Sequence, residues 1–427
     1  DQDGNIILKS INDIVTIRNN SNIKANGNIT VDAATDATII NSTLASKNGN
    51  ISFKGNDKAI ASNSFLTANN GNIDFATTGN NIGGSNGITI LKTEFNSKKN
   101  TLTSNNGSID IMDQSKLIAT EGDNTIDAVN GDINIYDTTI NAQVGNNTIK
   151  SQKGSVSILN NTKVIAAKES NITAEKDIAI TKGSNIKAGL NNNLTSKTGK
   201  VSIKDIGTEV ESTGADVNIT QKLSAALDSH YSGTVKAANN INLTVNGTGE
   251  NITGSSLDRF IAGNKIALDA DNKIELSKRT GDLNLKKVDL NSKENNLTAK
   301  NGNVIMSDEI TLGNKTNKTT IKGKNVKTTG NGEIKANNKK LIVNADKDID
   351  ITFSGVGNKN AGLEINSDVN TSGTGDKNQQ ANNDNLAGKN VKLNAKDKQI
   401  AIAKVKADTL EIVDGQNTKL IAATDNR

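Results

Sequence analysis

Asn130-Gly131-Asp132-Ile133-Asn134-Ile135 is the repeating unit of this chain, because near-copies of it return along the 427 residues. In each copy a turn is followed by an apolar, polar, apolar triplet. Asn and Gly tolerate the positive φ angles of tight turns, and the triplet places two aliphatic side chains on one face of an extended segment. Each copy therefore predicts a turn and a short strand. Further copies begin at Asn26, Asn48, Asn70, Asn106, Thr198 and Thr280.

The copies recur at a nearly constant interval. Gly27, Gly49 and Gly71 are 22 residues apart, and Gly131 follows Gly107 by 24 residues. Two further strand-like segments recur within each period, one just before the turn, as at 100–104, and one after the Gly strand, as at 115–119. A period in this range is typical of stacked solenoids. We therefore expect three short strands and three turns in each repeat.

Stacking is the way in which such strands become stable. They are too short to stand alone as hairpins, and no segment of helical period lies between them to cover a sheet. If each repeat is one coil, its strands pair in parallel with those of neighbouring coils, and every backbone donor is used. The sequence thus predicts an all-β fold, a parallel β-helix that runs continuously over residues 1–427.

The triplets also predict which side chains form the core. Their aliphatic positions should point inward: Ile109, Ile111, Ile133, Ile135, Val156 and Ile158. The polar positions between them should point outward: Asp110, Asn134 and Ser157. Asn residues at equivalent turns should stack into ladders of side-chain amides.

The composition agrees with a thin core. Aromatic residues make up 2% of the chain, hydrophobic residues 33%, and Trp, Cys and Pro are absent. Without Pro, almost every residue keeps a backbone N–H for a sheet ladder. Without Cys there is no disulfide framework and no thiolate metal site. Lys and Asp are interleaved, and the net charge of +4 forms no basic stripe with aromatic partners, so we expect no nucleic-acid binding. No apolar run is long enough for a transmembrane segment, and residues 1–4 do not resemble a signal peptide.

Three intervals interrupt the rhythm, near 80–87, 223–262 and 353–389. They are rich in Gly or polar residues, and we interpret them as loop excursions from one continuous β-helix.

The search for chemistry predicts no catalytic, cofactor-binding or metal-binding residues. Gly83-Gly84-Ser85-Asn86-Gly87 fits the pattern of a nucleophile elbow, but a strand-like segment follows where that motif needs a helix. His230 is the only histidine and hence the only imidazole base. We therefore expect that the protein is not an enzyme and needs no cofactor.

The interval 223–262 holds the candidate partner-binding residues. It concentrates residue types that are rare in this chain, and Arg and aromatic side chains are the usual anchors of recognition surfaces. The candidates are His230, Tyr231, Arg259 and Phe260. The alternative is that Tyr231 and Phe260 fill a local widening of the core.

The tandem repeats, with Ser-Thr-Leu-Ala-Ser-Lys-Asn-Gly-Asn-Ile-Ser-Phe at Ser42–Phe53, resemble the repeat region of filamentous-haemagglutinin-type exoproteins, the secreted partners of two-partner secretion systems. The resemblance covers nearly the whole chain. It implies a right-handed β-helical shaft, exported by an outer-membrane transporter and displayed on a Gram-negative cell as a monomeric fibre. It further implies an adhesin that binds a host or bacterial cell-surface receptor or glycan, or the stick of a contact-dependent inhibition toxin.

Two classes of function remain open. The first is a secreted, surface-displayed adhesin shaft that attaches to host or neighbouring cells, or the related shaft of a toxin-delivery protein. The second is a β-helical carbohydrate-active enzyme, which would need a groove with clustered carboxylates and aromatic sugar platforms.

Overall fold

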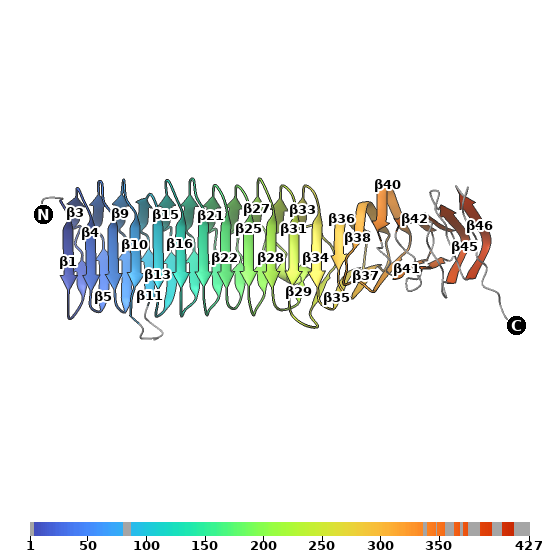
Figure 1. Ribbon diagram of the computed structural model, residues 1–427, viewed down its shortest axis with the longest axis horizontal. Helices are drawn as coiled ribbons and strands as arrows, with labels where there is room; N and C mark the ends of the chain where they lie inside the picture. The colour runs from blue at the N-terminus through green and yellow to red at the C-terminus, as the bar shows by residue number, and fades with distance from the viewer. Residues whose placement is uncertain are drawn as a thin grey trace. The chain divides into compact units, whose positions relative to one another are not determined.

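The computed structural model describes residues 4–79, 87–335, 340–346, 348–354, 363–367, 370–374, 385–394 and 404–413. The chain divides into two compact units. Unit 1 comprises residues 1–222 and 230–241, and unit 2 comprises residues 223–229 and 242–427. Both consist of stacked parallel strands, which confirms the predicted parallel β-helix (Figure 1).

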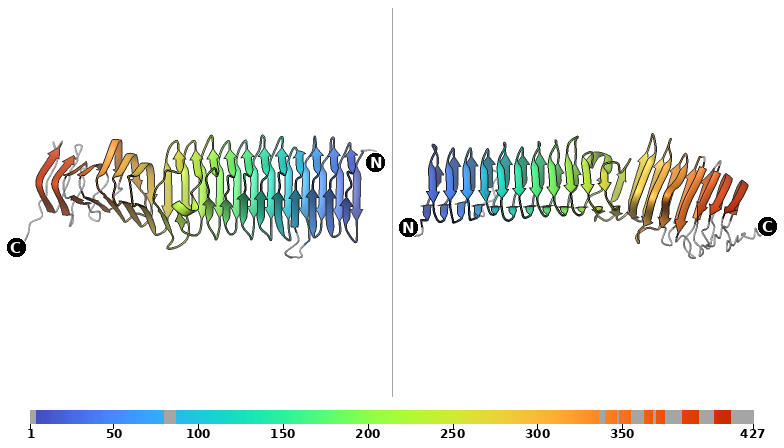
Figure 2. Two further views of the ribbon diagram at one scale, coloured as in Figure 1. Left: turned by 180° about the vertical axis from the view of Figure 1, so that it is seen from behind. Right: turned by 90° about the horizontal axis from the view of Figure 1, so that it is seen from above.

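Unit 1 has three parallel sheets, with one strand from each coil in sheets A and C and from all but the last coil in sheet B (Figures 1 and 2). Sheet A of unit 1 contains β1 (Ile6–Ser10), β4 (Ile29–Ala33), β7 (Ile51–Gly55), β10 (Ile73–Thr77), β13 (Asn100–Ser104), β16 (Asn124–Ala128), β19 (Asn147–Ser151), β22 (Ser170–Ala174), β25 (Asn192–Ser196) and β28 (Val217–Gln221). Sheet B contains β2 (Val15–Ile17), β5 (Asp36–Ile40), β8 (Lys58–Ser62), β11 (Gly87–Leu91), β14 (Ser108–Met112), β17 (Ile133–Tyr136), β20 (Val156–Leu159), β23 (Ile178–Ile180) and β26 (Val201–Ile203). Sheet C of unit 1 contains β3 (Asn22–Ala25), β6 (Thr43–Ser46), β9 (Phe65–Ala68), β12 (Glu94–Ser97), β15 (Lys116–Ala119), β18 (Thr139–Ala142), β21 (Lys163–Ala166), β24 (Asn185–Ala188), β27 (Glu209–Ser212) and β30 (Thr234–Ala237).

The strand register places similar aliphatic residues of successive coils on top of one another in the core. Ile133 of β17 pairs with Ile109 of β14 on one side and with Val156 of β20 on the other. The six aliphatic side chains predicted to point inward are all fully buried, which confirms their assignment. Asp110, Asn134 and Ser157 between them are half-buried on the outer face, as expected. Alternation of the side chains along each strand therefore sets both the register and the core.

Asn ladders are also confirmed. The side-chain amide of Asn100 donates to Oδ1 of Asn124 (2.9 Å), and that of Asn124 donates to Oδ1 of Asn147 (3.0 Å). These three side chains are at most 1% exposed and lie at the start of their sheet A strands. Because each buried amide needs both a donor and an acceptor, the repeat from coil to coil satisfies groups that a single coil could not.

The corner between sheets B and C depends on left-handed backbone. One or two residues there have a positive φ in each coil from β2 to β27, for example Asn41 (49°) and Asn63 (46°). The residue that follows each of these carries a hydroxyl, in Ser42 and Ser64, and both side chains are buried. The backbone N–H of Ser42 donates to Oγ of Ser64 (3.2 Å). Asn tolerates the left-handed backbone conformation. The hydroxyl oxygen accepts a hydrogen bond from a backbone N–H that the turn leaves without a partner in the sheet.

The Asn-Gly turn does not stay at one corner of the coil, although the sequence pattern treats all copies as equivalent. Gly27, Gly49 and Gly71 precede strands of sheet A, whereas Gly107 and Gly131 precede strands of sheet B. Gly107 follows Gly71 by 36 residues. That interval is longer than one coil, because the turn has moved on to the next corner.

Several strands of unit 2 are longer than those of unit 1. Unit 2 contains β29 (Ala225–Ala226), β32 (Asn251–Gly254), β33 (Phe260–Ala262), β34 (Ile266–Ala270), β35 (Lys273–Lys278), β36 (Leu283–Asn291), β37 (Glu294–Ala299), β38 (Val304–Leu312), β39 (Lys318–Gly323), β40 (Val326–Lys335), β41 (Lys340–Ala345), β42 (Asp348–Ser354), β43 (Leu363–Ser367), β44 (Asn370–Thr374), β45 (Asn385–Asn394) and β46 (Lys404–Val413). A four-residue helix, α1 (Leu227–His230), and β31 (Ile241–Val245) each hold residues of both units.

From β34 to β43 each strand of unit 2 pairs with the second strand after it, so a coil has two strands here. The long strands β36, β38 and β40 bend at residues of positive φ, namely Lys287, Asp308 and Gly330. The pairing of β36 with β38 shifts register at the bend. The predicted three strands per coil are thus confirmed in unit 1. In unit 2 a coil has two strands, because one long strand with a bend takes the place of two short strands.

The predicted excursions have different outcomes. The interval 80–87 lies outside the described residues except for Gly87. Within 223–262, β30 pairs in register with β27, so this interval leaves the coil over a shorter span than predicted. Within 353–389, the described strands β43 and β44 pair with β41 and β42 and so belong to the stack. The rest of that interval lies largely outside the described residues.

Candidate functional site

His230 and Tyr231 lie in unit 1, next to each other at the end of α1. The Tyr231 side chain is 2% exposed, and its hydroxyl donates to Oε1 of Gln221 (2.8 Å). The same oxygen accepts the backbone N–H of Val201 (3.1 Å). Burial raises the pKa of Tyr231 far above its ordinary value. Tyr231 is therefore a core residue, and the prediction that it is a surface anchor is wrong.

His230 is only half-buried, with its ring edge-on to that of Tyr231 at 6.5 Å between centroids. Burial, and then the positive charges of Lys200 and Lys204, lower the pKa of His230 below its ordinary value, against a smaller opposing effect of Asp177. The neutral imidazole is thus favoured.

Arg259 and Phe260 lie in unit 2. Arg259 is exposed, whereas the Phe260 side chain is 5% exposed. Phe260 therefore packs into the core and is no projecting anchor. The alternative that Tyr231 and Phe260 fill the core is confirmed, and a partner-binding role for His230 and Arg259 stays a prediction.

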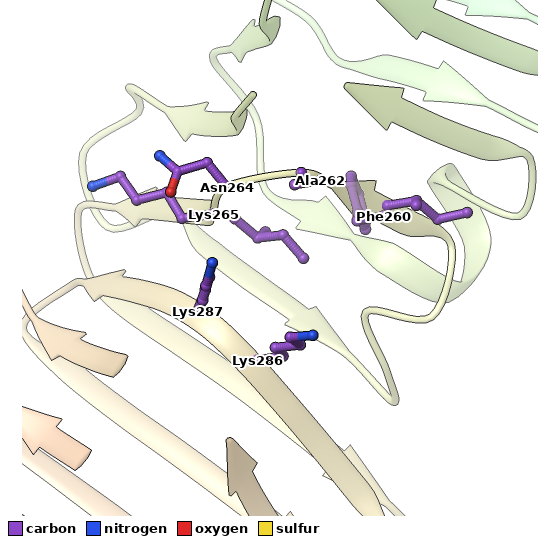
Figure 3. A pocket seen from close by; sticks show the side chains of 9 residues that line it. Phe260, Ala262, Asn264, Lys265, Lys286 and Lys287 are labelled. Atoms are coloured by element: carbon purple, nitrogen blue, oxygen red, sulfur yellow. The ribbon is translucent and has the colours of Figure 1, made fainter. Parts of the chain in front are cut away.

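Phe260 also lines a pocket of about 260 Å³ in unit 2 (Figure 3), which we call the lysine pocket. One wall is the segment 260–266, and the other is the bend of β36. The pairing of β34 with β36 begins only at Ile266 and Val288, so the residues before these two positions are free to form opposite walls. The pocket is lined by Phe260, Ile261, Ala262, Gly263, Asn264, Lys265, Ile266, Lys286 and Lys287.

The charges that line the pocket all have the same sign. Lys265 is ion-paired with Asp289. Lys286 and Lys287 rise from the bend opposite the segment 260–265 (Figure 3), and neither forms an ion pair with another described residue. Two unpaired ammonium groups beside an apolar floor favour a ligand that has an anionic group and an apolar flank.

Sequence reasoning missed Lys286 and Lys287, although a signal for them exists. Strands of this chain alternate apolar and polar positions, but two consecutive lysines separate the buried Leu285 from the buried Val288. An extra polar residue in an alternating strand is typical of a bend. The bend is at Lys287, with a φ of 49°.

The residues that the structure describes hold no group of three or more His, Cys, Asp or Glu side chains placed around one point. Ser85 of the nucleophile-elbow pattern lies outside the described residues. Nor does the described part of the chain include a helix with the length and apolar character needed to cross a membrane.

Comparison of the chain with protein-family models, with curated proteins and with solved structures found no match.

Proposed function

We propose that this chain is a secreted, surface-displayed shaft of the filamentous-haemagglutinin type, which attaches a bacterium to host or neighbouring cells. The observation that carries the proposal is the unbroken parallel register of unit 1, from β1 to β28 in sheet A. Each coil repeats the same thin core and the same polar outer positions, so the stack provides length more than it provides a cleft.

The location of the lysine pocket fits this role. A surface that repeats coil after coil offers little specificity, so a ligand is recognised where the repeat is broken. The pocket lies where β36 bends and where two lysines are unpaired among the described residues. We therefore assign to it the contact with an anionic group, such as a carboxylate or a sulfate, on the partner cell.

The test is an adherence assay with beads that display the whole chain. The double variant Lys286→Gln/Lys287→Asn removes both charges, and Asn is suited to the positive φ of residue 287. The matched control is Lys300→Gln/Lys322→Gln, which removes two exposed charges from unit 2 outside the pocket. We expect the pocket variant to lose most of its adherence at physiological salt and the control to keep it.

The adherence of the wild-type chain tests the broader proposal of an adhesin. If beads that carry the folded wild-type chain do not adhere to host or bacterial cells, the adhesin proposal is wrong. Equal adherence of both double variants and the wild type would rule out the pocket but not the shaft. Release of reducing ends from a polysaccharide panel would instead favour the carbohydrate-active enzyme.

A further inference from the structure

A second recess lies in unit 1, along the corner between sheets B and C in the coils nearest β1. Its volume is about 300 Å³, and we call it the Asn groove. It is lined by Asn20, Ser21, Asn22, Asn41, Ser42, Thr43, Asn63 and Phe65. None of these side chains is charged. The groove is thus chemically different from the lysine pocket.

Three of the lining residues occupy the left-handed position of successive coils. The φ angles of Asn20, Asn41 and Asn63 are 60°, 49° and 46°. All three side chains are exposed. Since successive coils are about 4.8 Å apart, the corner presents a row of amides at that spacing.

These amides differ from the other Asn rows of unit 1. In the row Asn26, Asn48 and Asn70, the amide of each later residue donates to Oδ1 of the one before it, at 3.0 Å in both cases. In the Asn groove, no side-chain hydrogen bond joins Asn20, Asn41 or Asn63 to any described residue. Each amide therefore keeps a carbonyl oxygen and two N–H donors for a ligand.

An aromatic ring lies beside this row. Asn22, Thr43 and Phe65 are register partners in sheet C, and Phe65 is 56% exposed. In the same unit Phe53, Phe75 and Phe95 are fully buried. Phe65 thus offers a flat apolar face at the edge of a recess whose other groups form hydrogen bonds.

Further along unit 1, other residue types occupy the left-handed positions of this corner. The left-handed residues there include the charged Lys92, Asp113, Asp137 and Lys182, together with the uncharged Gln114, Asn160 and Asn161. Among the described residues, the coils of Asn20, Asn41 and Asn63 are the ones in which three successive coils carry an uncharged amide at this position, with the exposed ring of Phe65 beside them.

We infer that the Asn groove binds an uncharged oligosaccharide. The apolar C–H face of one sugar ring packs on Phe65, and the hydroxyl groups of that sugar and its neighbour exchange hydrogen bonds with the Asn amides. A sugar hydroxyl is both a donor and an acceptor, which matches an amide row with free groups of both kinds. Only the biological setting of the groove rests on the proposed function, because the binding itself is a property of the purified chain.

The experiment measures binding of the purified full chain to immobilised neutral oligosaccharides, and to sialylated and sulfated ones as a comparison. Phe65→Ala removes the ring, and Asn41→Gly removes an amide while it keeps the left-handed backbone. The matched controls are Tyr136→Ala, which removes an exposed ring outside the groove, and Asn48→Gly, which removes an amide from a row that is already paired. Circular dichroism confirms that each variant is folded.

We expect at least one neutral oligosaccharide to bind, with about tenfold weaker binding for Phe65→Ala and for Asn41→Gly and with unchanged binding for both controls. The inference is overturned if no neutral oligosaccharide binds, or if binding survives both groove substitutions. It is equally overturned if only acidic glycans bind and Lys286→Gln/Lys287→Asn abolishes that binding, because the lysine pocket is then responsible. Neutral glycan binding without cell adherence would support the groove while refuting the proposed function.

Discussion

Ile133 shows how little the core of unit 1 tolerates substitution. Its side chain is fully buried and stacks between Ile109 and Val156. Ile133→Ala should lower the free energy of unfolding by about 2–5 kcal/mol, since a thin core can collapse only partly around the cavity. Ile133→Asp should cost more, because it buries a carboxylate without a partner. Denaturation in urea, followed by circular dichroism, measures both.

Ser157→Asp is the control for this prediction. Ser157 follows the buried Val156 and is half-buried on the outer face, so a carboxylate there reaches water. The variant should remain within about 0.5 kcal/mol of the wild type. Near-normal stability of Ile133→Asp would show that the inward assignment of Ile133 is wrong.

His230 predicts how stability depends on pH. Its pKa in the folded chain lies below the ordinary value of 6.5, mainly because of burial. The unfolded chain therefore binds more protons between the two values, and stability falls as the pH decreases through that window. The urea midpoint should be lower at pH 5.5 than at pH 7.5. His230→Gln should reduce this difference, and an unchanged difference would mean that His230 does not cause it.

At the scale of the element, the buried Asn ladder is a connection between coils. Asn124→Ala leaves the Asn100 amide without its acceptor and Oδ1 of Asn147 without its donor. Two unsatisfied buried groups should cost about 2–4 kcal/mol of unfolding free energy. Asn48→Ala in the exposed row is the control and should cost less than about 1 kcal/mol, because water replaces the lost partners. Equal losses for the two variants would contradict a special role of the buried ladder.

Two glycines in turns should differ in how much their substitution by Ala destabilises the chain. A Cβ atom at Gly131 would lie 2.4 Å from the backbone of Gly107 and Ser108 in the neighbouring coil. At Gly122 the nearest atoms belong to the flexible side chain of Lys99, at 2.6 Å. Gly131→Ala should therefore destabilise the chain by about 1–3 kcal/mol, whereas Gly122→Ala should be nearly neutral. Thermal melts of the two variants test this, and equal melting temperatures would refute it.

At the scale of the whole molecule, we predict that stability does not depend on a metal ion. The described residues contain no group of three or more potential ligand side chains around one point. Treatment with a chelator should therefore leave Tm unchanged. A lower Tm that calcium or zinc restores would show that a bound ion supports the stack.

Much of the fold was predictable from the sequence, because it depends on short-range periodicity. The triplet around Ile133 predicts the strand, its inward face and its parallel partner, since every coil repeats the same alternation of apolar and polar residues. The bend of β36 was harder to predict. Positive φ at Lys287 is set by packing along the long strand, and Lys is not a residue type that predicts left-handed backbone.

The candidate site was less predictable for a similar reason. Rare residue types directed attention to Tyr231 and Phe260, but rarity does not distinguish a buried ring from an exposed one. Lys286 and Lys287 are common residues, and they became conspicuous only when the structure showed which lysines lacked an acidic neighbour. Pairing of that kind depends on contacts between strands that are about 20 residues apart in the chain, as in Lys265 with Asp289.

A receptor or antibody that recognises the Asn-Gly turn would meet it on two different edges of unit 1. The turns at Gly27, Gly49 and Gly71 lie on the edge where sheet C passes into sheet A. Those at Gly107 and Gly131 lie on the edge where sheet A passes into sheet B. A multivalent receptor therefore gains avidity within one run of turns, but a rigid one cannot span both runs from a single direction of approach.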